Sequence, residues 1–160
     1  MRIRPAGDDD WAAIMPFFTA IVDDGETYAY PSGLTSDEAR ALWFDGAHVV
    51  VAEADGRVVG SARMGPNRPG RGAHVATASF MVDPAARGAG VGRALGEHVL
   101  AWATEQGFKA VQFNAVVETN GPAVRLWRSL GFRVVGTVPE AFDSRRHGLV
   151  GLHVMHRPLP

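Results

Sequence analysis

The chain has 160 residues, of which 46% are hydrophobic, so it is long enough to bury one substantial core and too short for two ordinary domains. It contains no cysteine, which excludes disulfides, a cysteine nucleophile and thiolate metal sites. A formal net charge of -1 argues against broad electrostatic binding to nucleic acid or to an anionic membrane.

Apolar periodicity and turn residues predict alternating strands and helices along the chain. The first half is expected to begin with a short strand from Ile3, followed by a helix that runs to Val22 and that Pro16 disturbs, with Asp8–Asp10 as its N-cap and acidic first turn. A second helix follows, with a capping box at Thr35 and Glu38. A hairpin of strands 49–54 and 57–63 and a central strand that ends at Val82 complete this half. The second half is expected to hold a helix over 91–103, a strand over 110–117, a helix over 122–130, and strands over 133–138 and 149–156. Antiparallel strands followed by a strand-helix-strand crossover predict an α/β (α+β) fold with a mixed sheet.

A glycine-rich loop, Arg87–Arg93, directly follows the central strand and opens a helix. Gly88, Gly90 and Gly92 lack β-carbons, so consecutive N–H groups can converge there on an anion. The helix adds the positive end of its dipole, and the guanidinium groups of Arg87 and Arg93 can add charge-assisted hydrogen bonds. The loop therefore predicts a pyrophosphate site.

Two well-known phosphate loops do not fit these residues. A P-loop needs Lys followed by Ser or Thr after its last glycine, but Arg93 and Ala94 stand there. A dinucleotide fingerprint needs a third glycine, which would fall at Leu95 or at Arg93. Neither a nucleoside triphosphatase nor a dinucleotide enzyme is indicated.

Arg87, Gly90 and Gly92 instead form R-x-x-G-x-G, which resembles the acetyl-coenzyme A loop of the GNAT family of N-acetyltransferases. The segment 120–132 resembles the second signature of that family: an Asn, then Ala, Leu and an aromatic residue on one helix face, then Leu-Gly-Phe. The resemblance implies a single GNAT domain over 1–160. Its sheet would be mostly antiparallel, with a central splayed pair of parallel strands, and helices would flank it.

The resemblance also implies direct transfer of an acetyl group from acetyl-CoA, as cosubstrate, to an amine. The residues that it places against the coenzyme are Phe80, Met81, Val82, Arg87, Gly88, Ala89, Gly90, Val91, Gly92, Arg93, Asn120 and Trp127. Asn120 is equally well placed as a helix N-cap, and the two roles can coexist. Many members carry a tyrosine at the position of Trp127, where it protonates the leaving thiolate. Because an indole N–H is far too weak an acid for that, we expect Trp127 to pack in the core or to line the coenzyme groove.

Without that tyrosine, other polar groups become the candidates for the chemistry. Asn114 lies in the strand over 110–117, where an amide is costly unless it is hydrogen-bonded. Its partner is either the substrate or thioester, or a neighbouring side chain or buried water. Glu118 and His74 are candidates to take the proton of the amine.

Two further similarities concern the acceptor. Phe113-Asn114 with 118–120 is similar to the fungal acetyltransferases of proline analogues such as azetidine-2-carboxylate, and the loop from Glu26 to Pro31 resembles the phosphinothricin-type acetylases. Together they imply an amino acid or an amino-acid analogue as acceptor. Glu26, Tyr28 and Tyr30 are the candidate acceptor-site residues, and surface packing explains each of them equally well.

Two other functions stay open. One is acetylation of a protein or peptide N-terminus, which needs a groove for an extended chain. The other is a coenzyme-binding module without catalysis, suggested by the missing tyrosine. We expect a small-molecule amine as partner, with no nucleic acid and no membrane, and family resemblance implies a homodimer. No His or carboxylate pair has metal-ligand spacing, so no metal is predicted. No apolar signal core follows Met1, which favours a cytoplasmic location.

Overall fold

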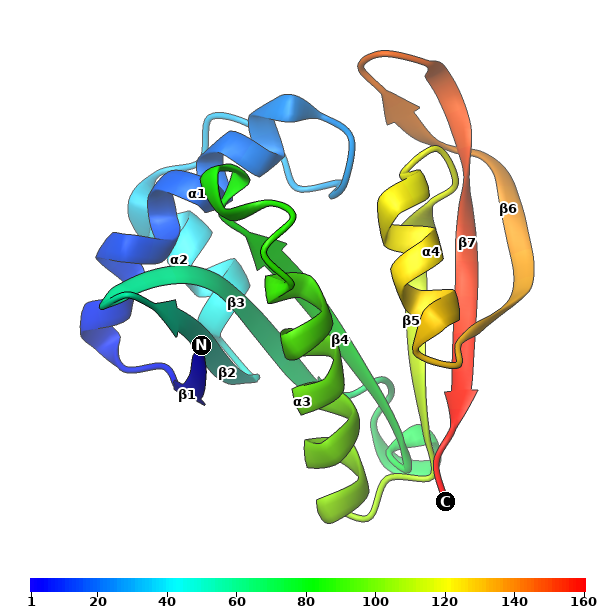
Figure 1. The fold of residues 1–160 in the computed structure, drawn as a ribbon. Helices are drawn as coiled ribbons and strands as arrows, with labels where there is room; N and C mark the ends of the chain where they lie inside the picture. The colour runs from blue at the N-terminus through cyan, green and yellow to red at the C-terminus, as the bar shows by residue number, and fades with distance from the viewer.

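Seven strands pair into one sheet in the computed structural model, which describes all 160 residues (Figure 1). The strands are β1 (Arg2–Pro5), β2 (His48–Ala54), β3 (Arg57–Pro66), β4 (Val75–Val82), β5 (Ala110–Val117), β6 (Arg133–Ser144) and β7 (Gly148–Pro158), in the sheet order β1-β2-β3-β4-β5-β7-β6. The helices are α1 (Trp11–Asp24), α2 (Ser36–Phe44), α3 (Val91–Glu105) and α4 (Gly121–Ser129). None of the helices has the length and hydrophobicity needed to cross a membrane.

The centre of the sheet is splayed, as the family resemblance implied. All neighbouring strands are antiparallel except β4 and β5, which run parallel and pair only through Val75 with Ala110 and Ala76 with Val111. Beyond these residues the two strands diverge, which Figure 1 shows as a V that opens toward the start of α3. The mixed sheet and its helices confirm the predicted fold class.

The two faces of the sheet are covered by different helices. Helices α1 and α2 pack on one face, and α3 packs on the other, next to α4 (Figure 1). In the core under α1 and α2, the buried Trp43 indole donates to Ser61 Oγ at 2.9 Å, and that hydroxyl donates to the Val50 carbonyl at 2.8 Å. This chain of bonds satisfies the polar atoms of the core, as buried groups require.

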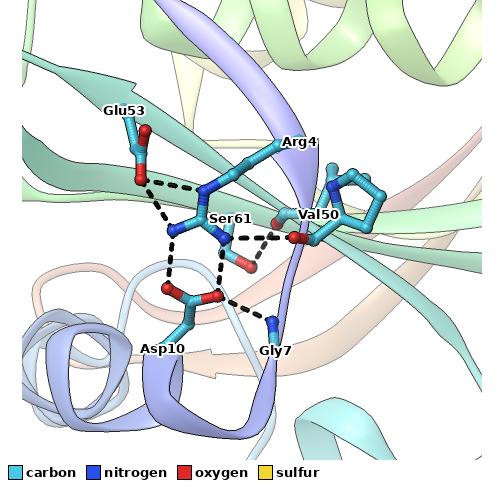
Figure 2. A network of polar contacts seen from close by, with 7 residues as sticks. Arg4, Gly7, Asp10, Val50, Glu53 and Ser61 are labelled. Atoms are coloured by element: carbon cyan, nitrogen blue, oxygen red, sulfur yellow. Dashed lines mark hydrogen bonds and ion pairs between the residues drawn. The ribbon is translucent and has the colours of Figure 1, made fainter.

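The start of α1 differs from the prediction. Asp8–Asp10 form a 3-10 turn, and the α-helix begins only at Trp11. Figure 2 shows the cause: the Asp10 carboxylate accepts two bonds of 2.8 Å from the Arg4 guanidinium and one of 2.7 Å from the Gly7 N–H. The same guanidinium binds Glu53 Oε1 on β2 at 2.6 Å and 2.8 Å. An ion pair thus ties β1 and β2 to this turn, and Asp10 is engaged there rather than in capping the helix.

Helix α1 is also longer and more regular than predicted. It continues without a break through Pro16 to Asp24, beyond the predicted end at Val22. Proline removes one backbone donor from a helix. The apolar side chains of α1 that pack on the sheet, such as the fully buried Ile14, hold the helix against that loss.

A glycine on β3 brings α3 close to the sheet. A β-carbon at Gly60 would lie 2.8 Å from Val91 Cγ1, 3.1 Å from Leu95 Cδ1 and 3.1 Å from the Met81 carbonyl oxygen. These distances are too short for a methyl group. Gly60 therefore lets the first turn of α3, and with it the glycine-rich loop, sit directly at the end of β4.

Candidate active site

A pocket of about 720 Å³ lies where β4 and β5 diverge. Its walls are residues 77–82 of β4, residues 113–117 of β5 and the first turns of α4. The glycine-rich loop contributes Arg87, Gly88 and Gly92, while the end of α1, the loop after it and the β6–β7 turn supply the ionisable residues Asp24, Glu26, Arg146 and His147. One continuous cavity therefore joins the predicted phosphate site to residues far away in the sequence.

The glycine-rich loop presents free backbone donors. The N–H groups of Gly88, Gly90, Val91, Gly92 and Arg93 have no acceptor within the chain, because the first bond of α3 runs from the Ala94 N–H to the Gly90 carbonyl at 3.0 Å. Gly88 and Gly90 have φ values of 82° and 80°, and a β-carbon at either would point into open space. Such a concave set of donors suits the pyrophosphate of a coenzyme. Ala89 departs from the expectation, since its N–H donates to the Ala86 carbonyl at 3.3 Å.

The two arginines that flank the loop point in different directions. Arg87 is exposed, lines the pocket and pairs with no carboxylate. The Arg93 guanidinium instead donates to Ser129 Oγ at 2.6 Å and lies 3.6 Å from the Glu97 carboxylate. The expectation that both guanidinium groups face the phosphates is thus corrected: Arg93 offers the loop its backbone N–H, and its side chain braces α3 against α4.

Tyr28 binds the main chain of β4 inside the pocket. The Phe80 N–H donates to the Tyr28 hydroxyl at 2.7 Å, and the hydroxyl donates to the Phe80 carbonyl at 2.5 Å. The divergence of β5 leaves both of these main-chain groups without a strand partner, and the tyrosine takes that place. Burial raises the pKa of Tyr28 well above its usual value, so the phenol stays protonated at neutral pH.

Trp127 packs among aromatic rings from both sides of the V. Its ring centroid lies 4.6 Å from that of Phe80 on β4 and 4.8 Å from that of Phe113 on β5, and only 7% of the residue is exposed. It also lines the pocket. The structure therefore places Trp127 where a packing residue and a wall of the coenzyme groove would both lie. On β4, Met81 and Val82 both line the pocket, and the Met81 side chain is also buried in the core.

Asn114 lies in the pocket and not in the core. Its pairing region on β5 contains an irregularity, because the register with β7 shifts between Phe113 and Val116. The Asn114 side chain is exposed, donates to Asn67 Oδ1 at 2.6 Å and accepts from Gln112 Nε2 at 2.9 Å. The sequence analysis expected a buried amide, and it gave no sign of Asn67 as the partner, since Asn67 lies in the irregular segment after β3.

Glu118 does not face the pocket. Its carboxylate accepts a bond of 2.7 Å from the Gly151 N–H, and its own N–H donates to the Gly151 carbonyl at 3.0 Å. These bonds extend the pairing of β5 with β7 and turn the side chain toward β7. His74 is exposed and lies outside the pocket as well. Both residues therefore lack the position that removing a proton from a substrate in this pocket requires.

Asn120 lies both at the N-terminus of α4 and in the lining of the pocket, as its two expected roles require. It is the N-cap of α4, where its Oδ1 accepts from the Ala123 N–H at 3.4 Å, and it also lines the pocket. The bond is long, and the side chain remains within reach of a ligand in the groove. The capping role is therefore present, and the coenzyme role stays a prediction.

The far end of the pocket is built by the turn between β6 and β7. The Glu26 carboxylate accepts from Ser144 Oγ at 2.7 Å and from the Arg146 N–H at 2.8 Å, and the Arg146 guanidinium lies 3.2 Å from the Asp24 carboxylate. The bond from Ser144, followed by that from the Arg146 N–H, lowers the pKa of Glu26 and keeps it ionised. These contacts join the turn to the loop after α1 across the mouth of the pocket.

The three acceptor-site candidates thus have different surroundings, and two residues were missed. Glu26 and Tyr28 line the pocket, whereas Tyr30 stacks on Phe18 at 5.5 Å and lies outside it, which corrects its assignment. Arg146 and His147 line the pocket and were not anticipated. Their only signal is a run of basic residues at a turn between two strands, which by itself matches no binding motif.

Comparison with known proteins agrees with this geometry. Residues 15–132 match the model of the acetyltransferase (GNAT) family. The chain belongs to the GNAT family. It is 62% identical to a GCN5-related N-acetyltransferase from Kribbella flavida, whose structure superposes with a TM-score of 0.95 and covers 99% of this chain and 97% of that one.

Two other similar proteins are more distant. A phosphinothricin acetyltransferase from Sinorhizobium meliloti, solved in complex with AcCoA, is 26% identical with a TM-score of 0.87, over 99% of this chain and 88% of that one. The N-acetyltransferase aca1 of Schizosaccharomyces pombe is 28% identical over 90% of this chain and 78% of its own. The chain spans less than half the length of the mycothiol acetyltransferases that it also matches. These findings identify the protein as an N-acetyltransferase and confirm the resemblance seen in its two motifs.

Proposed function

We propose that the protein transfers the acetyl group of acetyl-CoA directly to the amine of a small molecule, an amino acid or an amino-acid analogue. The observation that carries the proposal is that one pocket runs from a loop with five free N–H groups to an end lined by charges of both signs. The AcCoA complex of the similar S. meliloti enzyme supports the choice of coenzyme.

The residues that fit the coenzyme lie in the glycine-rich loop, at the end of β4 and at the start of α4. The free N–H groups of the glycine-rich loop and the Arg87 guanidinium would hold the pyrophosphate, because an open nest of backbone donors beside a cation favours an anion. The end of β4 and Asn120 would bind the arm. When bound, acetyl-CoA supplies the acetyl group as a reactive thioester.

The chain itself supplies hydrogen bonds at the centre of the pocket. The single protons of the Phe80 N–H and the Tyr28 hydroxyl on the β4 side are already donated within that pair of residues, whereas the Asn114 amide on the β5 side has a second N–H beyond its bond to Asn67. Preorganised donors of this kind stabilise negative charge that develops on a carbonyl oxygen. The second N–H of the Asn114 amide is therefore our candidate for polarising the group that is transferred.

The charged end of the pocket suits an amino acid. The Asp24 and Glu26 carboxylates attract an ammonium group, and the Arg146 guanidinium can bind a carboxylate, although it already lies 3.2 Å from Asp24. The turn of residues 144–147 closes this end by its bonds to Glu26 and by the bond of 3.3 Å from the Arg145 N–H to the Gly25 carbonyl. An extended peptide would need this end open, so the closed turn favours a small acceptor.

The test has two parts. Calorimetry with acetyl-CoA should give a dissociation constant in the micromolar range, and thiol release should then be followed with the L-amino acids, phosphinothricin, short peptides with free N-termini, and simple amines. Release with amino acids or phosphinothricin, but not with peptides, is the expected result. Preference for peptides would establish the N-terminal acetyltransferase instead, binding without any release would establish the non-catalytic module, and absence of binding would refute the proposal.

A homodimer is part of the same proposal. It rests on the family resemblance. Val135 and Val138 on β6 and Leu149 on β7, which are 54%, 54% and 61% exposed, are apolar side chains that a partner subunit could cover. Light scattering measures the mass directly. A mass of about one chain at micromolar concentration would refute this part of the proposal and leave the activity untouched.

A further inference from the structure

The proposed transfer requires a base that the sequence motifs do not provide. An ammonium nitrogen has no free electron pair, and the α-amino group of a peptide model has a pKa of about 8, so such an amine is mostly protonated at neutral pH. A side chain near the acceptor must therefore take a proton before the nitrogen can attack. The inference below rests on the proposed function.

Most ionisable groups of the pocket already form hydrogen bonds or ion pairs within the chain. The Glu26 carboxylate holds Ser144 and the Arg146 N–H, and its lowered pKa makes it a weak base. The Asp24 carboxylate pairs with the Arg146 guanidinium. Tyr28 is a neutral phenol engaged with Phe80, and burial raises its pKa. These four groups can bind or donate, but none of them is suited to accept a proton.

His147 is the remaining ionisable residue at this end of the pocket. Its backbone N–H donates to Ser144 Oγ at 3.1 Å, which fixes it within the turn that also holds Glu26. Its ring makes no hydrogen bond within the chain, it lines the pocket, and the residue is exposed. Imidazole is the side chain whose ordinary pKa lies nearest to neutrality, so it exchanges protons readily there.

We propose that His147 removes the proton from the acceptor amine, and that the Glu26 carboxylate beside it holds the ammonium and stabilises the imidazolium. A ring nitrogen of His147 takes the proton, and the neutral nitrogen forms the C–N bond with the acetyl carbon. The C–S bond breaks, and the nitrogen, now bonded to the acetyl carbon, loses its second proton to solvent. The thiolate takes a proton from solvent, and the imidazolium releases its own to solvent. The sum is one ammonium and one thioester converted to one amide, one thiol and one released proton.

The charges around His147 are consistent with this exchange. Glu26 and Asp24 face it from the loop after α1 and the end of α1, Arg145 and Arg146 belong to its own turn, and Arg87 lies toward the glycine-rich loop. The Glu26 carboxylate and His147 attract each other. The Glu26 and Asp24 carboxylates can therefore stabilise the positive charge that forms on the ring when it takes the proton.

The test compares His147→Gln with His74→Gln, a matched change at an exposed histidine outside the pocket. The kcat/KM for the amine that gives the fastest thiol release is measured from pH 6 to pH 10. We expect His147→Gln to lose about 100-fold at pH 7, within the usual range for a general base. The loss should shrink toward high pH, where free amine forms unaided. The KM for acetyl-CoA should stay unchanged in both variants.

A second measurement is independent of turnover. Diethylpyrocarbonate should modify His147 in the free protein, and the same amine should protect it, while His74 should be modified equally with and without amine; peptide mass spectrometry reads both sites. If the unaltered protein releases no thiol with any amine, the proposed function itself fails. If it is active and His147→Gln keeps the same rate and pH profile, or if the amine gives no protection, only the assignment of His147 is overturned.

Discussion

Gly90→Glu separates the two properties on which the glycine-rich loop depends, backbone conformation and charge. Gly90 has a φ of 80°, and a β-carbon there meets no atom within 4 Å, so a side chain would point into the open space that the free N–H groups surround. The glutamate would then occupy the place of the phosphates and repel them. The fold should persist, since nothing in the chain is displaced.

The two effects have different sizes. A non-glycine residue in the left-handed region costs about 1–2 kcal/mol of stability, which for a domain of this size lowers Tm by about 2–8 °C. One added negative charge about 5 Å from one phosphate charge, at an effective dielectric constant of about 20, is repelled by about 3 kcal/mol. That energy weakens coenzyme binding about a hundredfold. Binding should therefore suffer far more than folding.

The assay is calorimetric titration with coenzyme A, together with Tm, for Gly90→Glu and two controls. Gly90→Gln has nearly the same bulk without the charge, so the ratio of the two dissociation constants isolates the repulsion. Gly33→Glu places the same residue at an exposed site with a φ of 76° outside the pocket, and it should lower Tm without changing affinity. A folded Gly90→Glu protein with unchanged affinity would refute the assignment of the loop as the pyrophosphate site.

Three other changes test the pocket and its support. Asn114→Ala should lower kcat while coenzyme affinity stays within about twofold; an unchanged kcat would leave Asn114 a purely structural role beside Asn67. The pKa of Glu26 is lowered in the folded protein, so the stability that Glu26 contributes is present above its pKa in the unfolded chain and is lost as the pH falls through its pKa in the folded protein. Glu26→Gln should therefore reduce the difference between the Tm at pH 7 and the Tm at pH 3, and an unaltered difference would contradict this. Gly60→Ala should lower the free energy of unfolding in urea by about 1–3 kcal/mol by overpacking, whereas Gly65→Ala on the same strand, with no atom closer than 4.0 Å, should not; equal effects would contradict the close approach of α3.

Local patterns predicted the elements well because they depend on neighbours in the sequence. Asp55-Gly56 marked the β2–β3 hairpin, and the capping box of Thr35 and Glu38 is present at the start of α2 with bonds of 3.1 Å and 3.2 Å. The errors arose where a distant partner intervened. Arg4 draws the Asp10 carboxylate away from a capping role.

The site residues also divide into those that local sequence could predict and those that depend on distant partners. The glycine-rich loop was predictable because its free donors follow from glycine and from the start of a helix, both local properties. The positions of Glu118 and Tyr30, and the partner of Asn114, could not be predicted because they depend on Gly151, Phe18 and Asn67, which are distant in the sequence. Strand alternation cannot anticipate an irregularity in register such as the one on β5.

The sequence by itself determined the glycine-rich loop with its free N–H groups, the order of strands and helices and, through two motifs, the family. Only the tertiary structure decided what surrounds the acceptor. Ser144 and Glu26 are 118 residues apart, and their bond of 2.7 Å exists because the β6–β7 hairpin reaches across the splayed sheet to the loop after α1. Backbone conformation is determined mainly by neighbouring residues in the sequence, whereas the charges that meet in a pocket depend on which distant segments the folded sheet brings together.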